Sequence, residues 1–390
     1  MVKRSLSYSQ FKKIYLFSEM GHKIQRFKET HPEAKVINLG VGDTVFPIAP
    51  SIALAMERAA NGMGTNDYYQ GYIEGEGLYE LREKIAEVYY GKRFSPEEIF
   101  ISDGAKTDLA RLPIFLGRNL NVGVQDPTYP AYFDALSLLG DYRITRIPCL
   151  LKHGFFPQIN DLSSIDVLYI CNPNNPTAIP YTAKELKELI LFAKRHQAFI
   201  IYDAVYSGYI QDKSFPCSIY DVEGAKDVAI EINSLSKTAG FSGLRLGWTV
   251  VPKQLHFACK NQVLKDYRRF LAATFNGVSV LSQKGALASF EKEGQKEVKK
   301  LILSYLSCAR QLKGAFTQLG YQVYGGEHAP YLWVHAPKQP LWEAFEYFLK
   351  EKQLIVTPGI GFGPSGRDFF RVSAFLKKEQ LSGVLARLSF

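Results

Sequence analysis

The sequence predicts an α/β fold in which a large domain, with a mostly parallel sheet sandwiched by helices, is joined to a smaller α+β domain. Short apolar runs alternate with longer amphipathic segments, which is typical of a parallel sheet covered by helices. The 390 residues are too many for one simple core. The C-terminal third begins with helical patterns and then turns to strand-like runs. We expect a large domain over residues 47–285 and a small domain built from 1–46 and 286–390.

The expected strands of the large sheet are short apolar runs that end in polar residues, at 99–101, 122–124, 167–170, 199–202 and 228–232. Helices are predicted over 78–90 and 183–196, because apolar residues recur there at helical spacing opposite a charged face. In the last third of the chain, strand-like runs at 331–335 and 369–375 belong to the expected small domain.

Composition limits the classes of protein to consider. The apolar fraction of 46% and charged fraction of 22% are ordinary for a globular protein, and no apolar run is long enough to span a membrane. The basic N-terminus lacks a small-residue cleavage site, and an odd count of five cysteines indicates free thiols, so we expect a cytoplasmic protein.

The net charge of +9 has two interpretations: a nucleic-acid or membrane surface, or a solvated basic surface that attracts anionic substrates. No Lys/Arg block forms a dedicated tail, so we expect neither nucleic acid nor membrane as a partner. The histidines show no zinc-like spacing, so we expect no metal.

Polar residues follow each expected strand of the large sheet. Because ligands bind outside the carboxyl ends of parallel strands, these residues are expected to meet at one place. In chain order they are Gly104, Ala105 and Lys106 at a predicted helix start, then Tyr129, then Asn175, then Asp203 and Tyr206, and finally Ser234, Ser236, Lys237 and Arg245.

This set of groups suits a planar, phosphorylated pyridine aldehyde. A lysine amine forms a Schiff base with an aldehyde, and a carboxylate holds a pyridine nitrogen protonated so that the ring accepts electrons. Hydroxyls, an arginine and the N–H groups of a helix start hold a phosphate. Taken alone, Lys237 would be interpreted as a surface charge, Asp203 as a residue that caps a turn and Asn175 as a residue that stabilises a turn. Their occurrence at consecutive strand ends favours a binding site.

Four segments resemble the signature stretches of the class I/II aminotransferases, which are fold-type I enzymes dependent on pyridoxal 5′-phosphate (PLP): NPNNPT, YDAVYSGY, SLSKTAGFSGLRLG and FFRVSAF. The resemblance implies that Lys237 carries PLP and moves the reacting proton, and that Asp203 pairs with the ring nitrogen. It further implies that Tyr129 stacks on the ring and that Arg371 grips the substrate α-carboxylate. By the same resemblance, Asn175 and Tyr206 would hydrogen-bond the ring's phenolic oxygen. The residues that would hold the phosphate are Ala105, Lys106, Ser234, Ser236 and Arg245. Tyr72 would reach the phosphate of a neighbouring subunit, which implies a homodimer with shared active sites.

The stretches INLGVGDTVFPIAP, GYIEGEGLYELREKIA and ISDGAKTDLARL resemble a narrower branch of that family. This branch passes the amino group of glutamate to tetrahydrodipicolinate, which gives LL-diaminopimelate for lysine and peptidoglycan precursors. The resemblance implies that the substrate pocket also contains Tyr15, Gly42, Lys106, Tyr129, Asn175 and, from the partner subunit, Asn276. Glu74 and Glu76 are both candidates to meet the substrate's distal ammonium. The alternatives are an aminotransferase for aspartate, aromatic or broad substrates, or a PLP carbon–sulfur β-lyase.

Overall fold

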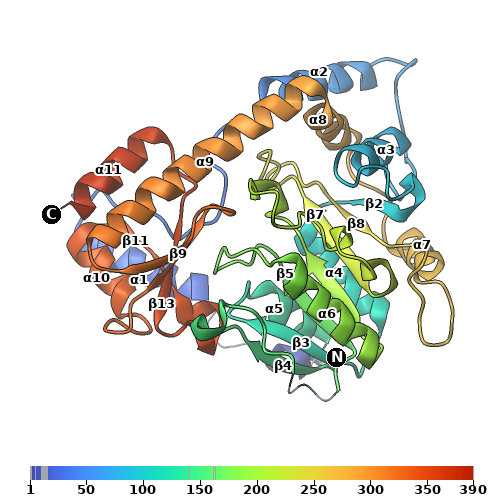
Figure 1. Cartoon of the computed structure of the whole chain (residues 1–390). Coiled ribbons are helices and arrows are strands. Elements are labelled where there is room, and N and C mark those ends of the chain that lie inside the picture. The colour runs from blue at the N-terminus through green and yellow to red at the C-terminus, as the bar shows by residue number, and fades with distance from the viewer. Residues whose placement is uncertain are drawn as a thin grey trace.

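A seven-stranded sheet is the centre of the computed structural model, which describes residues 2–4, 6–9, 16–139, 141–160, 162 and 164–389 (Figure 1). The strand order is β2-β8-β7-β6-β5-β3-β4, and every strand except β8 runs in the same direction. The bounds are β2 (Ile99–Ser102), β3 (Asn121–Asp126), β4 (Arg143–Pro148), β5 (Val167–Cys171), β6 (Phe199–Asp203), β7 (Ala229–Ser234) and β8 (Gly247–Val250). The predicted α/β fold is therefore confirmed, and all five expected strands are present.

Two strands of this sheet, β4 and β8, were not among those the apolar pattern predicted. In β4, an edge strand, the exposed residues Arg143 and Arg146 interrupt the apolar run. In β8 there are only four residues, and Gly247 and Thr249 weaken the apolar signal. Both strands are defined by backbone pairing with a neighbour, β4 with β3 and β8 with β2 and β7. A local sequence pattern does not contain that pairing.

Helices cover both faces of the sheet, so alternate residues of one strand enter different cores. In β5, Leu168 and Ile170 share a core with α2 (Pro50–Met63), α3 (Tyr79–Val88), α6 (Ala183–His196) and α8 (Val280–Phe290). On the opposite face, Val167 and Tyr169 share a core with α4 (Ala105–Leu116), α5 (Ala131–Leu139) and α7 (Val263–Thr274). Burial on both faces explains why the central strands read as nearly continuous apolar runs.

The two predicted helices are confirmed as α3 and α6. A capping box defines the start of α6: the Thr182 hydroxyl accepts the Glu185 N–H at 3.2 Å, and the Glu185 carboxylate accepts the Thr182 N–H at 2.7 Å. Short 3₁₀ helices connect the longer elements, namely η1 (Leu6–Ser9), η2 (Pro96–Glu98), η3 (Leu151–His153), η4 (Ser207–Tyr209), η5 (Ile219–Asp221), η6 (Ala225–Asp227), η7 (Gly359–Phe362) and η8 (Pro364–Gly366).

The last third of the chain builds a smaller antiparallel sheet in the order β12-β13-β10-β9. Its strands are β9 (Gln322–Gly325), β10 (Tyr331–His335), β12 (Thr357–Pro358) and β13 (Phe369–Ser373), beside a parallel pair of β1 (Ile37–Asn38) and β11 (Leu354–Ile355). The helices packed on it are α1 (Leu16–Thr30), α10 (Glu343–Lys352) and α11 (Lys378–Leu388).

A long helix, α9 (Lys292–Gln318), connects the two sheets and measures about 40 Å at 1.5 Å per residue (Figure 1). Its middle residue Tyr305 packs in a core of the large sheet, whereas Leu312 and Phe316 pack in that of the small sheet. The domain limits at 46/47 and 285/286 stay a prediction, and the second of them falls within α8.

Two expectations from composition can be set beside the structure. All five cysteines are free, with Cys217 and Cys259 exposed and the other three buried. Among the helices of the described residues, none combines the length and apolar character needed to cross a membrane. The cytoplasmic location stays a prediction.

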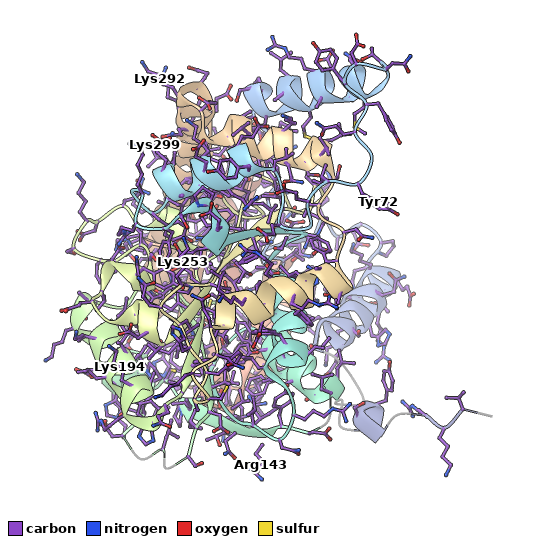
Figure 2. All side chains as sticks on the ribbon, turned by 90° about the vertical axis from the view of Figure 1, so that its right-hand side faces the viewer. Tyr72, Arg143, Lys194, Lys253, Lys292 and Lys299 are labelled. Atoms are coloured by element: carbon purple, nitrogen blue, oxygen red, sulfur yellow. The ribbon has the colours of Figure 1, made fainter. Side chains whose placement is uncertain are left out.

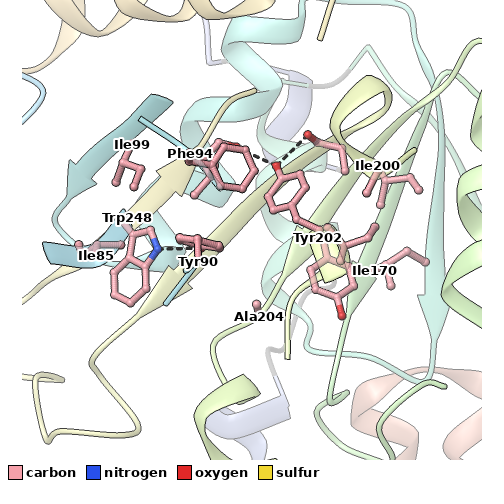
Figure 3. Close-up of a cluster of buried hydrophobic side chains, with 14 of the residues drawn as sticks. Ile85, Tyr90, Phe94, Ile99, Ile170, Ile200, Tyr202, Ala204 and Trp248 are labelled. Atoms are coloured by element: carbon pink, nitrogen blue, oxygen red, sulfur yellow. Dashed lines mark hydrogen bonds between the residues drawn. The ribbon is translucent and has the colours of Figure 1, made fainter. Parts of the chain in front are cut away.

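A buried carboxylate, Glu231 of β7, lies in the large-domain core. It accepts hydrogen bonds from the hydroxyls of Tyr90, at 2.8 Å, and Ser218, at 2.5 Å. The indole N–H of Trp248 donates in turn to the Tyr90 hydroxyl at 3.0 Å (Figure 3). Burial raises the pKa of Glu231 to about 7, although these hydrogen bonds act in the opposite direction.

We expect the free energy of unfolding to decrease as the pH rises from about 4.5 to about 7, because folded Glu231 holds a proton that the unfolded chain releases. Replacing Glu231 with glutamine should remove roughly 1–3 kcal/mol of that decrease. Urea unfolding at several pH values measures the slope, with Glu188→Gln, on the exposed side of α6, as the matched control. Equal slopes in wild type and Glu231→Gln would contradict the assignment.

Candidate functional site

A cavity of about 500 Å³ opens where the carboxyl ends of the parallel strands meet the small domain. Most of the predicted site residues line it: Gly42, Ala105, Lys106, Tyr129, Asn175, Asp203, Tyr206, Ser234, Ser236, Lys237, Arg245 and Arg371. The structure therefore brings together residues from every predicted strand end, although the role of each stays a prediction.

Lys237 follows β7 and extends its amine toward the loop after β1. The Nζ donates to the Gly42 carbonyl at 2.7 Å and lies 3.6 Å from Oδ1 of Asp43. Burial lowers the pKa of Lys237, an effect that the Asp43 carboxylate opposes. A lysine with a lowered pKa has a larger neutral fraction, which is the form that attacks a carbonyl and accepts a proton.

Asp203 is the last residue of β6 and is only 4% exposed. The Tyr132 hydroxyl donates to its Oδ2 at 2.7 Å, and the Val205 N–H donates to its Oδ1 at 3.1 Å. Burial raises the pKa of Asp203 to about 6 against both hydrogen bonds. No lysine or arginine of the described residues contributes to that pKa, so the carboxylate fits a cation supplied by a ligand, such as a protonated ring nitrogen.

A group of donors lies at the start of α4. Gly104, at φ +108°, turns the chain from β2 into this helix, and its first N–H groups have no partner within the helix. A Cβ at Gly104 would lie 2.4 Å from Nη2 of Arg245, so the glycine leaves room for that guanidinium. The hydroxyls of Ser234 and Ser236, 2.9 Å apart, line the same cavity. Hydroxyls, a guanidinium and a helix start together form a cradle that suits a phosphate.

Arg371 of β13 is buried on the side of the cavity nearest the small domain, with 2% of its surface exposed. Its Nη1 donates to Oδ1 of Asn175 and its Nη2 to the Gly40 carbonyl, each at 2.7 Å. The Nε is buried and finds no hydrogen-bond partner among the residues that the structure describes. A buried guanidinium held by neutral groups, with one donor unsatisfied, fits an incoming carboxylate.

Three predicted site residues are not gathered in this cavity. Tyr72, 91% exposed on the loop before α3, projects away from the body of the molecule (Figure 2). Asn276 is exposed on the loop after α7 and does not line the cavity. These two loops touch each other, since a Cβ at Gly277 would lie 3.2 Å from the Glu74 carbonyl oxygen. Tyr15 lies outside the described residues.

Several residues around the cavity were not predicted from the sequence, namely Val41, Asp43, Leu109, Tyr132, Cys171, Val205, Ser242 and Tyr331. One of them carried a usable signal, because Asp43 adjoins Gly42. Tyr331 stands at the start of a predicted strand. Its neighbours in the sequence do not show whether its hydroxyl faces the cavity or its ring only fills the core. Among the described residues, no group of three or more His, Cys, Asp or Glu side chains is arranged to hold a metal ion.

Comparison with known proteins adds independent information. Residues 34–388 match the family model described as aminotransferase class I and II. The chain is 44% identical to an LL-diaminopimelate aminotransferase of Protochlamydia amoebophila, over 100% of this chain and 97% of that protein. It is 40% identical to the chloroplastic LL-diaminopimelate aminotransferase of Arabidopsis thaliana, over 97% of this chain and 85% of that protein. A solved structure of the L,L-diaminopimelate aminotransferase from Chlamydomonas reinhardtii superposes with a TM-score of 0.95 at 40% identity, covering 100% of this chain and 98% of that one.

Proposed function

The chain belongs to the class I and II aminotransferase family. We propose that it transfers the amino group of glutamate to tetrahydrodipicolinate, which gives LL-diaminopimelate and 2-oxoglutarate, in lysine biosynthesis. The observation that carries this proposal is the shared cavity of Lys237, Asp203 and Arg371. It joins an amine, a buried carboxylate and a carboxylate-binding guanidinium, which are the groups that transamination requires.

Membership of this family implies dependence on PLP, and the residues present fit that cofactor. Within the described part of the chain, no lysine or arginine affects the pKa of Asp203, and Gly104 keeps open a cradle that a Cβ would fill. We assign the ring nitrogen to Asp203, the aldehyde to Lys237 and the ring face to Tyr129. The ring's phenolic oxygen is assigned to Asn175 and Tyr206. The phosphate is assigned to Ala105, Lys106, Ser234, Ser236 and Arg245. When bound, PLP supplies an aldehyde that takes up the amino group and a ring that accepts electrons.

The chain's own residues handle the proton and the substrate. The Nζ of Lys237 takes the proton from the substrate's α-carbon, and such general base catalysis contributes about 10²–10⁴-fold in rate. Arg371 binds the α-carboxylate, and its guanidinium is already oriented by Asn175 and the Gly40 carbonyl. Orienting the donor before the substrate binds lowers the entropic cost of binding.

The far end of diaminopimelate carries an ammonium and a carboxylate, so its recognition requires groups of both kinds. Glu76 pairs with Arg82 and Arg268, and its carboxylate is therefore already satisfied. Glu74 pairs with Arg82 as its one ionic partner in the described ranges, and its side chain is 75% exposed. Glu74 is thus the better candidate of the two to meet a distal ammonium.

We also propose a homodimer with shared active sites. Tyr72, Glu74 and Asn276 lie on adjoining exposed loops outside this chain's own cavity. In a dimer, Tyr72 would supply a phosphate contact to the neighbouring site, and Asn276 would serve the distal carboxylate without repelling the ammonium. Sedimentation of the PLP-loaded protein tests this proposal, which a monomer with full activity would contradict.

The experiment that tests the function is a coupled assay of the PLP-loaded protein with 2-oxoglutarate. Four amino donors are compared: LL-diaminopimelate, meso-diaminopimelate, aspartate and tyrosine. We expect the highest kcat/KM with LL-diaminopimelate. Turnover of aspartate or tyrosine alone would favour an aspartate or aromatic aminotransferase, and pyruvate release from cystathionine would favour a β-lyase.

Replacing Arg371 with lysine is expected to raise the KM for glutamate roughly 10- to 100-fold. Lysine keeps the charge, but it cannot make the paired hydrogen bonds of a guanidinium to a carboxylate, each a charge-assisted bond of about 1.5–3 kcal/mol. Steady-state kinetics with varied glutamate measures the change. Arg367→Lys, at an exposed position before β13, is the matched control. An unchanged KM in Arg371→Lys would contradict the assignment.

A further inference from the structure

Tyr331, the first residue of β10, lines the cavity beside the proposed reaction centre and is 1% exposed. Its hydroxyl lies 2.9 Å from the hydroxyl of Tyr206, and the two rings meet edge to face at 5.3 Å. Burial raises the pKa of both phenols, so both keep their protons at neutral pH. Each phenol has a single proton to donate, and the direction of one hydrogen bond therefore sets the direction of the next.

The ring of Tyr331 makes a second contact with the site. The guanidinium carbon of Arg371 lies 4.5 Å from the centre of this ring and 4.8 Å from that of Phe362, both within the range of cation–π attraction. Strand register explains the contact. Tyr331 pairs with Ser373, and Arg371, two residues before Ser373 on β13, lies on the same face of the sheet.

A third contact joins Tyr331 to the loop that receives Lys237. A Cβ at Gly42 would lie 2.1 Å from the Tyr331 hydroxyl, so this hydroxyl packs directly against the glycine. The carbonyl of Gly42 accepts the hydrogen bond from Lys237. One side chain thus touches a residue assigned to the cofactor, one assigned to the substrate carboxylate, and the loop that holds the lysine amine.

We propose that Tyr331 is a positioning residue for transamination, whose hydroxyl orients the Tyr206 phenol and whose ring holds the Arg371 guanidinium. This inference rests on the roles proposed above for Tyr206 and Arg371. When Tyr331 donates to Tyr206, the Tyr206 proton is left to point at the cofactor's phenolic oxygen.

The hydroxyl is tested with Tyr331→Phe, which keeps the ring. A hydrogen bond to the cofactor's phenolic oxygen stabilises its anion, so a poorly oriented Tyr206 should raise the pH midpoint of the holoenzyme's absorbance change. We expect a rise on the order of 0.5–1 pH unit, the equivalent of one hydrogen bond, with little change in the KM for glutamate. In a Tyr206→Phe background, the same substitution should add nothing, because it acts through Tyr206.

The matched control is Tyr220→Phe, which removes a buried hydroxyl that donates to backbone carbonyls in the large-domain core. This variant should lower stability without moving the absorbance midpoint. An unchanged midpoint in Tyr331→Phe, or an equal shift with and without Tyr206, would overturn the role of the hydroxyl. Failure of Tyr331→Phe to fold would also overturn it, in favour of a purely structural role.

The ring is tested with Tyr331→Leu, which removes the aromatic face below Arg371. The KM for glutamate should rise roughly 3- to 30-fold beyond that of Tyr331→Phe, the range of a buried cation–π contact. Equal KM values in the two variants would overturn the role of the ring. Both tests use the glutamate half-reaction and the absorbance of bound PLP. A wild-type protein that is inactive on diaminopimelate would therefore refute the proposed substrate without deciding this inference.

Discussion

Replacing Lys237 with alanine is expected to lower kcat by at least about 10²–10⁴-fold, the usual contribution of a positioned general base, while the protein still binds PLP. The amine is central because its Nζ, held by Gly42, reaches into the cavity beside Asp203. The phosphate cradle and Asp203 do not depend on it, so the cofactor should remain bound without a covalent link.

Two measurements decide this prediction. Stopped-flow mixing with glutamate gives the rate of amino transfer, and borohydride treatment followed by gel filtration distinguishes covalent from non-covalent PLP. The control is Lys194→Ala, an exposed lysine on α6 that pairs with Asp227. Ordinary ping-pong kinetics in Lys237→Ala would refute the role of Lys237 and, with it, the proposed chemistry.

Replacing Asp203 with alanine is expected to lower kcat roughly 10²- to 10⁴-fold, because a buried charge pair that loses one member costs about 3–5 kcal/mol. Burial raises the pKa of Asp203 to about 6. A protonated ring nitrogen would oppose that shift by placing a positive charge beside the carboxylate. The carboxylate is therefore expected to keep the ring nitrogen charged at neutral pH.

A cofactor methylated at the ring nitrogen separates this role from general disruption. Its ring carries a permanent positive charge, so it should recover part of the activity in Asp203→Ala and none in Lys237→Ala. Tyr132→Phe removes one hydrogen bond to the carboxylate and should cost only about 2- to 10-fold. Equal activity of both cofactors in Asp203→Ala would contradict a role at the ring nitrogen.

Most of the cavity was predictable from the chain because its chemistry is placed by local rules. Asp203 and Ser234 end buried strands, Lys237 follows one within three residues, and parallel strands carry their ends to one edge. The turn at Gly104 and the helix that begins at Ala105 also come directly after a buried strand, β2. A periodic apolar pattern and the polar residue after it are therefore enough to predict that these groups meet.

Other parts of the site depend on contacts between distant segments. Asn175 and Arg371 are far apart in sequence, yet they share a hydrogen bond because the small sheet packs against the strand ends. Tyr132 reads as an ordinary helix residue until its hydroxyl is seen on Asp203.

For this protein, the order of residues along the chain was sufficient to predict the α/β class, the five strands and the amine, carboxylate, hydroxyl and guanidinium groups that gather at the strand ends. Packing of the small sheet against the large one decided how Arg371 is held, that Tyr331 faces Tyr206, and that Asp43 lies near Lys237. The physical reason is range: strand ends and helix starts follow from neighbouring residues, whereas a side chain's partner across two domains depends on the packing of the whole chain.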